Sequence, residues 1–440
     1  MIKFYGTIWA NRHGTQIENM WYGVQIDESN SSPDLTRIAG SGYASFHASL
    51  PVQSLMKACL VADNGTVNYY LDPTDWSKKL DASASNLDGT DGQVMIEIPA
   101  FYYKVEMDTP SSGVHQLKIS KEAITGFTLV PKRYVSAYEA AINRNTNTVA
   151  SVVNTSTDYR GGNNESSYDG NANSLLGCPA TNISRVNFRT YSQSRGSGWN
   201  MIGYDDVKWI YWLYVIEYAT LHTQKAYDGT LTVEGYKKGG LGPGISTADN
   251  TEWTTFNDTN PFILCGSSNS LASASGYVDV TKTDFGGSGV NRIFSVPRYR
   301  GLENIFGHIM AITDGVIMIL QSDADGGENR AYISDNPSNW NDSDYSTYRG
   351  PLVLARLKAI SKIAILGAYA DYLAEVAEGS NSSAYYCDYH YTATPDTTVT
   401  RAFMTSGRSA DGGLAGMTYV NLDRASGYYS NSFGTRLRFQ

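Results

Sequence analysis

The sequence has few charged residues, and its positive charge is not concentrated anywhere. Only 18% of its 440 residues are Asp, Glu, Lys or Arg, the formal net charge is -9, and no run of Lys and Arg exceeds two residues. Binding to nucleic acid depends on a basic surface that neutralises phosphates, so we expect no nucleic-acid partner. Neutral ligands and uncharged glycans are compatible with this charge.

An apolar run that could cross a membrane is also missing. The longest apolar stretch, residues 352–377, is interrupted by five charged residues, whose insertion into a bilayer would be too costly. The first residues, Met1 to Gly6, do not show the charged and apolar pattern of a secretory signal. We therefore expect a protein that is made in the cytoplasm, does not use the general secretory pathway and does not insert into a membrane.

The sequence lacks the common motifs for catalysis and for tightly bound cofactors. None of the four cysteines forms a CxxC pair, and no two of the six histidines have metal-binding helical spacing. Ser197 lies between two glycines, but the spacer residues of a Gly-x-Ser-x-Gly nucleophile turn are missing. We expect no cofactor, and we expect buried free thiols at Cys59, Cys178, Cys265 and Cys387.

Two acidic turns leave structural calcium open as an alternative. Residues 323–328 and 341–344 supply carboxylate and amide oxygens of the kind that Ca²⁺ prefers. Neither segment has the twelve-residue spacing of an EF-hand loop. We expect both to be solvated acidic turns without a bound metal.

Glycine and aromatic residues are abundant. The chain has 42 Gly, 32 Tyr and 8 Trp, with Ser, Thr and Asn in many polar positions. Aromatic and β-branched residues suit strands, while Gly, Asn and Asp supply turns. Tyr, Ser, Gly and Asn are also the residues from which adaptable binding loops are built. Composition alone fits a β-rich core and a binding surface equally well.

Local patterns predict short strands and a few helices. We expect strands at residues 24–26 and 94–98, and a hairpin turn at Asn64-Gly65. A short helix is expected at 136–141, and a longer one at 207–224 with an aromatic buried face, preceded by two acidic residues. Glu217 near that face is either a catalytic acid or, as we expect, a carboxylate satisfied by backbone amides.

Three blocks of the sequence carry a family resemblance. The first is Glu217-Tyr218-Ala219 in the Trp-rich helix, and the second is the segment from Tyr299 to His308, followed by an expected strand at 309–316 that lacks the family's Trp. The third is a series of C-terminal glycines that closes with Phe433-Gly434-Thr435-Arg436. In this order the blocks resemble the formylglycine-generating-enzyme branch of the C-type lectin fold, and more closely the variable proteins of diversity-generating retroelements in phages.

We expect an α+β fold with three parts, and the resemblance covers the third of them. Residues 1–20 form an attachment or oligomer-contact segment, and residues 21–125 form a β-rich N-terminal region. Residues 126–440 form a loop-rich C-type-lectin-like domain with few helices and a variable ligand-binding region at about 400–440.

In such retroelement targets, mutagenic copying changes certain positions while the framework stays fixed. The family's template implies changeable positions here at Arg408, Ala410, Asp411, Leu414, Asn421, Asp423, Arg424, Tyr428, Ser430 and Ser432. Tyr419, Tyr428 and Tyr429 are expected aromatic anchors. Alternation along an extended chain should bury a framework of Ala415, Phe433, Leu437 and Phe439 beneath this face. An ordinary surface loop of mixed polarity is the alternative.

The function implied is that of a receptor-binding protein of a phage or prophage tail, recognising a bacterial surface protein or glycan. Its expected place is the virion tail, as a homotrimer in contact with other tail proteins. A cell-surface adhesin with the same variable domain, and an enzyme of the same fold, are the alternatives. The family's catalytic members use a pair of C-terminal thiols, and Cys387 is the one cysteine in the last 170 residues, so we expect no enzyme.

Overall fold

The computed structural model describes residues 17–30, 32–107, 113–227, 261–284, 289, 291–356, 358–363, 367–377 and 388–440. The described chain is rich in strands and has few helices, which confirms the predicted β-rich character. Among these residues, no helix has both the length and the apolar character that crossing a membrane requires. Cys387 and most of the expected attachment segment at 1–20 lie outside the described residues.

One sheet is built from the first part of the chain. Its order is β2-β1-β8-β7-β9, and all the neighbouring strands are antiparallel. The expected strand at 24–26 lies within β1, whose Val24 is fully buried. The bounds are β1 Tyr22–Asp27, β2 Thr36–Ala39, β7 Phe101–Met107, β8 Val114–Ser120 and β9 Thr128–Val130, with the short helix α2 at Phe46–Ser49.

A second sheet joins segments that are far apart in sequence. Its order is β13-β26-β10-β6-β3-β4-β5, so the C-terminal strand lies between two strands from the middle of the chain. The Asn64-Gly65 hairpin and the strand at 94–98 are confirmed as the β3–β4 turn and β6. The bounds are β3 Lys57–Val61, β4 Val67–Asp72, β5 Asp75–Lys79, β6 Gln93–Ile98, β10 Arg133–Ser136, β13 Trp199–Met201 and β26 Leu437–Phe439.

This second sheet and the hydrophobic core beneath it cross the predicted boundary at residues 125 and 126. Strands β3 to β6 precede the boundary, while β10, β13 and β26 follow it. A single cluster of buried side chains extends from Tyr22 through the helix α4, Tyr204–Tyr218, to Leu422. The residues on the two sides of position 125 therefore share a sheet and a hydrophobic core.

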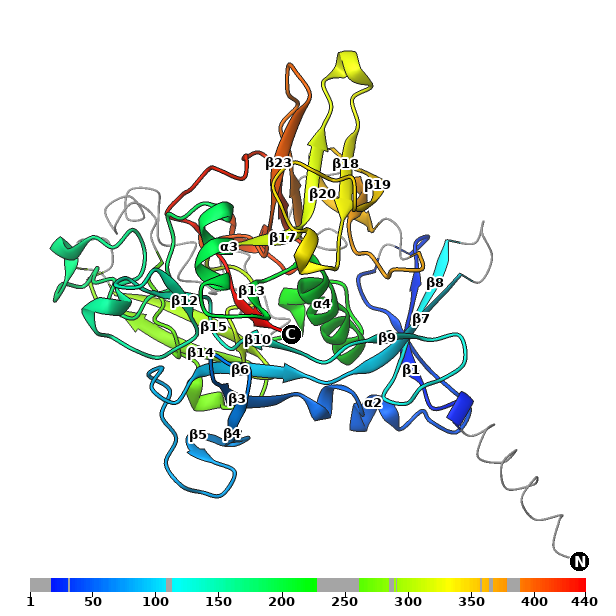
Figure 1. Ribbon diagram of the computed structural model, residues 1–440. Helices are drawn as coiled ribbons and strands as arrows, with labels where there is room; N and C mark the ends of the chain where they lie inside the picture. The colour runs from blue at the N-terminus through cyan, green and yellow to red at the C-terminus, as the bar shows by residue number, and fades with distance from the viewer. Residues whose placement is uncertain are drawn as a thin grey trace, which may run out of the picture.

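A third sheet is organised around the long strand β17. Its order is β19-β18-β17-β23-β24-β22-β20-β21, and β25 pairs with β17 in parallel. Figure 1 shows β18, β20 and β23 extending together away from α4. The bounds are β17 Met310–Leu320, β18 Asn329–Ile333, β19 Arg349–Leu354, β20 Lys358–Ile363, β21 Ala374–Ala377, β22 Tyr389–Tyr391, β23 Val399–Thr405, β24 Val420–Asn421 and β25 Phe433–Gly434.

Smaller pairings complete the strand pattern. Strand β14 pairs with β15, and β15 pairs with β16, while β11 and β12 form a separate hairpin. The bounds are β11 Ala141–Asn143, β12 Thr148–Ala150, β14 Gly276–Lys282, β15 Arg292–Tyr299 and β16 Leu302–Glu303.

The long helix α4, Tyr204–Tyr218, lies at the centre of the molecule (Figure 1). Asp205 and Asp206 lie in its first turn, as predicted, and Ala219 ends it in the left-handed conformation. The predicted end at residue 224 is therefore wrong. Twelve of its 15 residues are buried, so the helix is covered on all sides rather than along one aromatic face.

The predicted helix at 136–141 does not form. Strand β10 ends at Ser136, and the next residues use their backbone groups to bond distant segments. The Ala137 N–H donates to the Val94 carbonyl, and the Ala140 N–H donates to the Thr435 carbonyl. These long-range bonds replace the hydrogen bonds that a local helix would have made.

Candidate functional site

A cavity of about 280 Å³ opens at the C-terminal part of the chain. Its walls come from the segment after β23, from the long loop between β24 and β25, and from β17, β22 and β25. Nine of the twelve predicted site residues line it: Arg408, Asp411, Tyr419, Asn421, Asp423, Arg424, Tyr428, Ser430 and Ser432.

Three cavity residues had no place in the predicted set of contact residues. Met310 comes from β17, Tyr391 from β22 and Phe433 from β25. Phe433 had been assigned to the framework only. Tyr391 belongs to the aromatic stretch 385–391, which could have indicated it as a cavity residue. No pattern in the sequence around Met310 indicated that it would line the cavity.

The predicted contact residues differ in exposure, and part of the prediction needs correction. Tyr419, Asn421 and Ser432 are buried, with exposed fractions of 4%, 7% and 3%, so they form the wall and floor of the cavity. Tyr428 and Tyr429 are exposed at 41% and 59%. Tyr429 does not line the cavity, but its ring stacks on that of Tyr428.

The two remaining predicted residues lie in the 3₁₀ segment Ser409–Leu414. Leu414 is half-buried and does not line the cavity. Of Ala410, the structure describes only the backbone.

The predicted framework is largely confirmed. Ala415 and Leu437 are fully buried, and Phe433 is 5% exposed. Phe439 is half-buried, and its ring packs between those of Tyr134 and Trp199. The expected mechanism is wrong, however, because residues 422–432 form turns and bends rather than a strand with alternating sides.

Main-chain hydrogen bonds from other elements hold the loop between β24 and β25. The N–H groups of Asn182 and Arg185 donate to the carbonyls of Ser430 and Ser426, over 2.9 and 3.1 Å. On the other side, the Ala402 N–H donates to the Arg424 carbonyl and the Met310 N–H donates to the Ser432 carbonyl. The Leu422 N–H donates to the Tyr391 carbonyl. The loop backbone is thus fixed by contacts that do not depend on its own side chains.

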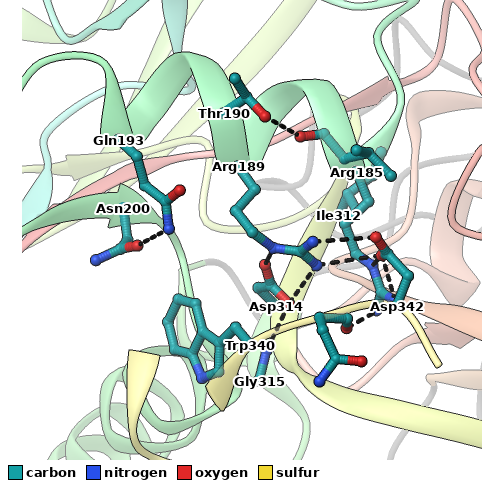
Figure 2. Close-up of polar contacts among 12 residues, drawn as sticks. Arg185, Arg189, Thr190, Gln193, Asn200, Ile312, Asp314, Gly315, Trp340 and Asp342 are labelled. Atoms are coloured by element: carbon teal, nitrogen blue, oxygen red, sulfur yellow. Dashed lines mark hydrogen bonds and ion pairs between the residues drawn. The ribbon is translucent and has the colours of Figure 1, made fainter. Parts of the chain in front are cut away.

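Helix α3, Arg185–Gln193, connects this loop to a buried ion-pair network. The Ser184 side chain caps the helix by accepting from the Asn187 N–H. Arg185 and Arg189 both bind Asp342, and Arg189 also binds Asp314 with two nitrogens (Figure 2). Asp314 is fully buried. The network ties α3, and through it the binding loop, to strand β17.

The ion-pair network lies at an irregularity in β17. The pairing of β17 with β23 shifts register between Thr313 and Met318. Gly315 in this interval has φ of +75°, and a Cβ there would come within 2.8 Å of the Ser334 carbonyl oxygen and of the Trp340 ring. The Gly315 N–H donates to Asp314, which turns the carboxylate toward Arg189. The irregularity in β17 therefore requires glycine at position 315 and directs the Asp314 carboxylate toward Arg189.

Charged side chains of both signs face the cavity and are paired within the segment. The Arg408 Nε lies 3.7 Å from Asp411, whose other carboxylate oxygen accepts from the Arg408 N–H over 2.8 Å. The Arg424 Nε lies 3.3 Å from Asp423, and its guanidinium stacks on the Tyr428 ring at 4.5 Å. Two positive and two negative groups leave the cavity without a net charge.

Two buried polar atoms in residues that line the cavity, the Arg408 Nε and the Asp423 Oδ1, have no hydrogen-bond partner among the described residues. Burial raises the pKa of Asp411, and the positive charge of Arg408 only partly opposes this rise. Burial, followed by the nearby Asp411, also raises the pKa of Tyr419. The cavity therefore offers both donors and acceptors in a partly desolvated setting.

A buried aspartate outside the cavity supports its wall. Asp388 is fully buried, and its Oδ2 accepts from both the N–H and the hydroxyl of Thr418, over 2.8 and 2.5 Å. Burial raises the pKa of Asp388 to about 7, although the hydrogen bonds from Thr418 oppose the rise. Because Tyr419 follows Thr418 directly, this carboxylate positions the buried aromatic wall of the cavity.

Replacing Asp388 with Asn should change how stability depends on pH. Between about pH 4 and 7, folded Asp388 keeps a proton that the unfolded chain has lost, so rising pH destabilises the fold. Above pH 7, folded Asp388 is ionised and the whole of this destabilisation is present. We expect Asp388→Asn to match the wild type near pH 4 and to be more stable at pH 8, by on the order of 3 kcal/mol. Urea unfolding at both pH values measures this difference.

His390 provides an internal control for that experiment. Burial lowers the pKa of His390 to about 4, so its contribution to stability is lost as pH falls below about 6.5. This effect has the opposite sign and is present in both proteins, so the difference between them isolates Asp388. The same pH dependence in both proteins would rule out Asp388 as the titrating group.

The alternative catalytic acid, Glu217, is held in an ion pair. Its carboxylate accepts from the Arg300 Nε and NH2 over 2.6 and 2.8 Å, and from the Tyr299 hydroxyl over 3.0 Å. The expectation that backbone amides satisfy it is therefore wrong, since side chains from the second resemblance block do so. This pairing links α4 to the segment around Arg300.

The acidic turns and the cysteines can also be placed. Asp342 is not merely solvated, since it pairs with Arg185 and Arg189, and Asp323 pairs with Arg356. Within the described ranges, no group of three or more His, Cys, Asp or Glu side chains is arranged to hold a metal ion. Free and buried thiols are found at Cys59, Cys178 and Cys265, as predicted.

Comparison with known proteins adds no relative. No protein-family model matches this chain, and no curated protein matches it either.

Proposed function

We infer that this protein is a receptor-binding protein of a phage or prophage tail, which recognises a bacterial surface protein or glycan through the C-terminal cavity and its rim. It belongs, in this proposal, to the variable proteins of diversity-generating retroelements, with an α+β fold of the C-type lectin kind. It acts by binding, without catalysis.

The observation that carries the proposal is the way in which the loop of residues 422–432 is held. Its carbonyls at Arg424, Ser426, Ser430 and Ser432 accept main-chain hydrogen bonds from three other parts of the fold, namely the start of α3, β17 and β23. A loop fixed through its main chain can change its side chains without losing its conformation. A diversified binding surface needs this separation of framework and contact residues.

The chemistry of the rim suits a protein or glycan surface. Tyr391 and Tyr428 are exposed at 40% and 41%, and Tyr429 extends the aromatic surface beyond the cavity. Tyrosine gives a large contact area at a low cost in conformational entropy. The balanced charges of Arg408, Asp411, Asp423 and Arg424 supply directional contacts without a strong preference for an ionic ligand.

The proposal includes a homotrimer attached to other tail proteins. Three identical faces on one particle would convert modest affinity at each face into strong avidity, because the later contacts form at high effective concentration. Sedimentation of the purified protein measures the oligomeric state directly.

Replacing Tyr428 or Arg424 with Ala should reduce binding without reducing stability. Both side chains are well exposed, so we expect the free energy of unfolding to change by less than about 0.5 kcal/mol. Binding to cells of a bacterial strain that the wild type recognises should weaken by roughly tenfold or more, as for central aromatic and Arg contacts. Flow cytometry with labelled protein, beside urea unfolding, gives both values.

Tyr345→Ala is a matched control for Tyr428→Ala. Tyr345 is exposed at 40%, close to the 41% of Tyr428, and its ring also stacks on another tyrosine, Tyr332. It does not line the cavity. Equal loss of cell binding in both variants, or a large loss of stability in Tyr428→Ala, would contradict the proposed face.

The genomic neighbourhood tests the family part of the proposal separately. A reverse transcriptase gene, with an Asn-rich near-copy of the 3′ end of this gene, would support the retroelement assignment. Neighbouring tail genes would support the phage assignment, whereas a surface-anchoring signal in the native gene would favour the adhesin.

A further inference from the structure

A second cavity of about 240 Å³ lies at the N-terminal end of α4 and shares no residue with the first. Its walls come from β7, β9, β10, α4, the segments around residues 335 and 369, and Gln440. The volume equals that of roughly eight water molecules, so the cavity fits a single sugar ring rather than a peptide chain.

The floor of this cavity is a fixed group of charges. Arg133, which is 1% exposed, pairs with Asp205 over 2.5 Å, and Lys208, which is 2% exposed, pairs with Asp205 over 2.8 Å. The Lys208 ammonium also lies 5.0 Å from the centre of the Trp209 ring. These charged groups are already paired with one another in the folded protein, so the floor of the cavity is held in place before a ligand binds.

Asp335 in the wall is different, because its side chain is exposed to solvent, whereas Arg133 and Lys208 in the floor are buried. Desolvation by the surrounding protein, followed by the nearby Asp205, raises its pKa, while Lys208 and Arg349 oppose the rise. Its exposed carboxylate oxygens can therefore accept hydrogen bonds from a ligand rich in hydroxyl groups.

The charges in the cavity do not favour an ionic ligand. Arg133 and Lys208 supply two positive charges, while Asp205 and Asp335 supply two negative ones. A balanced set of this kind gives neither an anion nor a cation a large electrostatic advantage. A neutral molecule with many hydroxyl groups can use both signs, because a hydroxyl donates to carboxylates and accepts from cations.

The rim provides apolar surface for the face of a sugar ring. Tyr369 and Leu129 are exposed at 51% and 50%, which is unusual for large apolar side chains. The Arg349 guanidinium lies 4.2 Å from the Tyr369 ring centre and bonds Asp371 with two nitrogens, which holds the ring in place. Tyr103 and Trp209, with ring centres 4.5 Å apart, form the inner aromatic wall.

We propose that this second cavity is a binding site for a neutral sugar ring, with Asp335 accepting from its hydroxyls and Tyr369 and Leu129 contacting its apolar face. Of its lining residues, Gln440 alone falls in the range assigned to the variable region, and it is not among the positions expected to change. The site therefore gives the protein a constant affinity for a glycan, whatever the diversified face recognises. The inference does not rest on the function proposed for the first cavity.

Saturation-transfer NMR on the full chain tests the site with defined probes. The methyl glycosides of glucose, galactose, mannose and N-acetylglucosamine serve as neutral probes, with glucosamine and glucuronate as cationic and anionic ones. We expect at least one neutral glycoside to bind. Asp335→Asn should weaken that binding by about tenfold, the usual cost of losing a charged acceptor, and Tyr369→Ala should also weaken it. Both residues are exposed, so both variants should fold.

The nearby pair Asp344→Asn and Tyr345→Ala supplies matched controls, since both side chains are exposed and neither lines the cavity. We expect these variants to bind the sugar like the wild type. The proposal is overturned if no neutral glycoside binds, if only the charged probes bind, or if the controls lose binding equally. Loss of the sugar signal in Tyr428→Ala would instead place the sugar in the first cavity. Failure of the cell-binding test with retained sugar binding would count against the proposed function alone.

Discussion

Replacing Asp314 with Asn is expected to destabilise the protein by roughly 3 kcal/mol, because it breaks a buried ion pair while leaving its partner in place. Asp314 is fully buried and binds Arg189 through both carboxylate oxygens, one of which also accepts from the Gly315 N–H over 2.9 Å. Asn has nearly the same shape, so the change removes charge rather than volume. Urea unfolding at neutral pH measures the loss.

The same substitution should loosen the binding loop. Arg189 lies in α3, whose first residue, Arg185, donates its N–H to the Ser426 carbonyl. If the ion pair anchors α3 against β17, the Asn182 and Arg185 amide protons should exchange faster with solvent in Asp314→Asn. Hydrogen-exchange NMR or mass spectrometry reports this directly. Unchanged exchange at both amides would show that the network does not position the loop.

Glu328→Gln is the matched control, since it is also an acid-to-amide change that removes one partner of an ion pair. Glu328 binds Arg330 over 2.8 Å, but the two side chains are 41% and 35% exposed. Exposed pairs contribute little, so we expect a loss below about 1 kcal/mol. Similar losses in both variants would mean that burial is not what makes the Asp314 pair important.

Replacing Gly416 with Ala is expected to be at least as damaging. A Cβ at this position would lie 1.9 Å from the Asp388 Oδ1, and Asp388 is fully buried and held by Thr418. The carboxylate has no room to move, so the loop before Tyr419 must shift. We expect a loss of roughly 3 kcal/mol or more and a disturbed cavity wall. Thermal unfolding and tyrosine near-UV circular dichroism measure the two effects.

Two further variants identify the cause. Gly427 lies in the binding loop and would meet no atom within 4 Å of an added Cβ, so Gly427→Ala should change stability by less than about 0.5 kcal/mol. Truncating Asp388 to Ala in the Gly416→Ala background should make room for the methyl group, so the two losses should not add. Additive losses would show that the clash lies elsewhere.

Local sequence patterns were a good guide to strands and turns. Alternation and turn chemistry predicted β1, β6 and the Asn64-Gly65 hairpin, because these features depend on neighbouring residues only. The helix expected at 136–141 failed for a tertiary reason. Its backbone N–H groups donate hydrogen bonds to the carbonyls of Val94 and Thr435, and no local sequence pattern can predict these distant partners.

The candidate site was predictable in part. Nine of the twelve residues predicted for the binding face line one cavity, but the sequence could not show which of them are buried in its wall and which are exposed at its rim. Tyr419 and Tyr428 are both tyrosines in the same segment, yet one is 4% exposed and the other 41%. Asp388 supports Tyr419 through Thr418, 30 residues away in sequence, and Met310 enters the cavity from β17. Such neighbours become visible only when distant segments are packed together.

The sequence by itself determined the strand-rich character and the local turns, because side-chain size, polarity and backbone preference act locally. Only the tertiary structure decided that Leu437–Phe439 lies between β10 and β13, and that Arg189 meets Asp314, 125 residues away. It also decided that the binding loop is held by main-chain donors from Asn182, Arg185, Met310 and Ala402. Every residue has such an N–H donor, so the choice among them depends on how the whole chain packs.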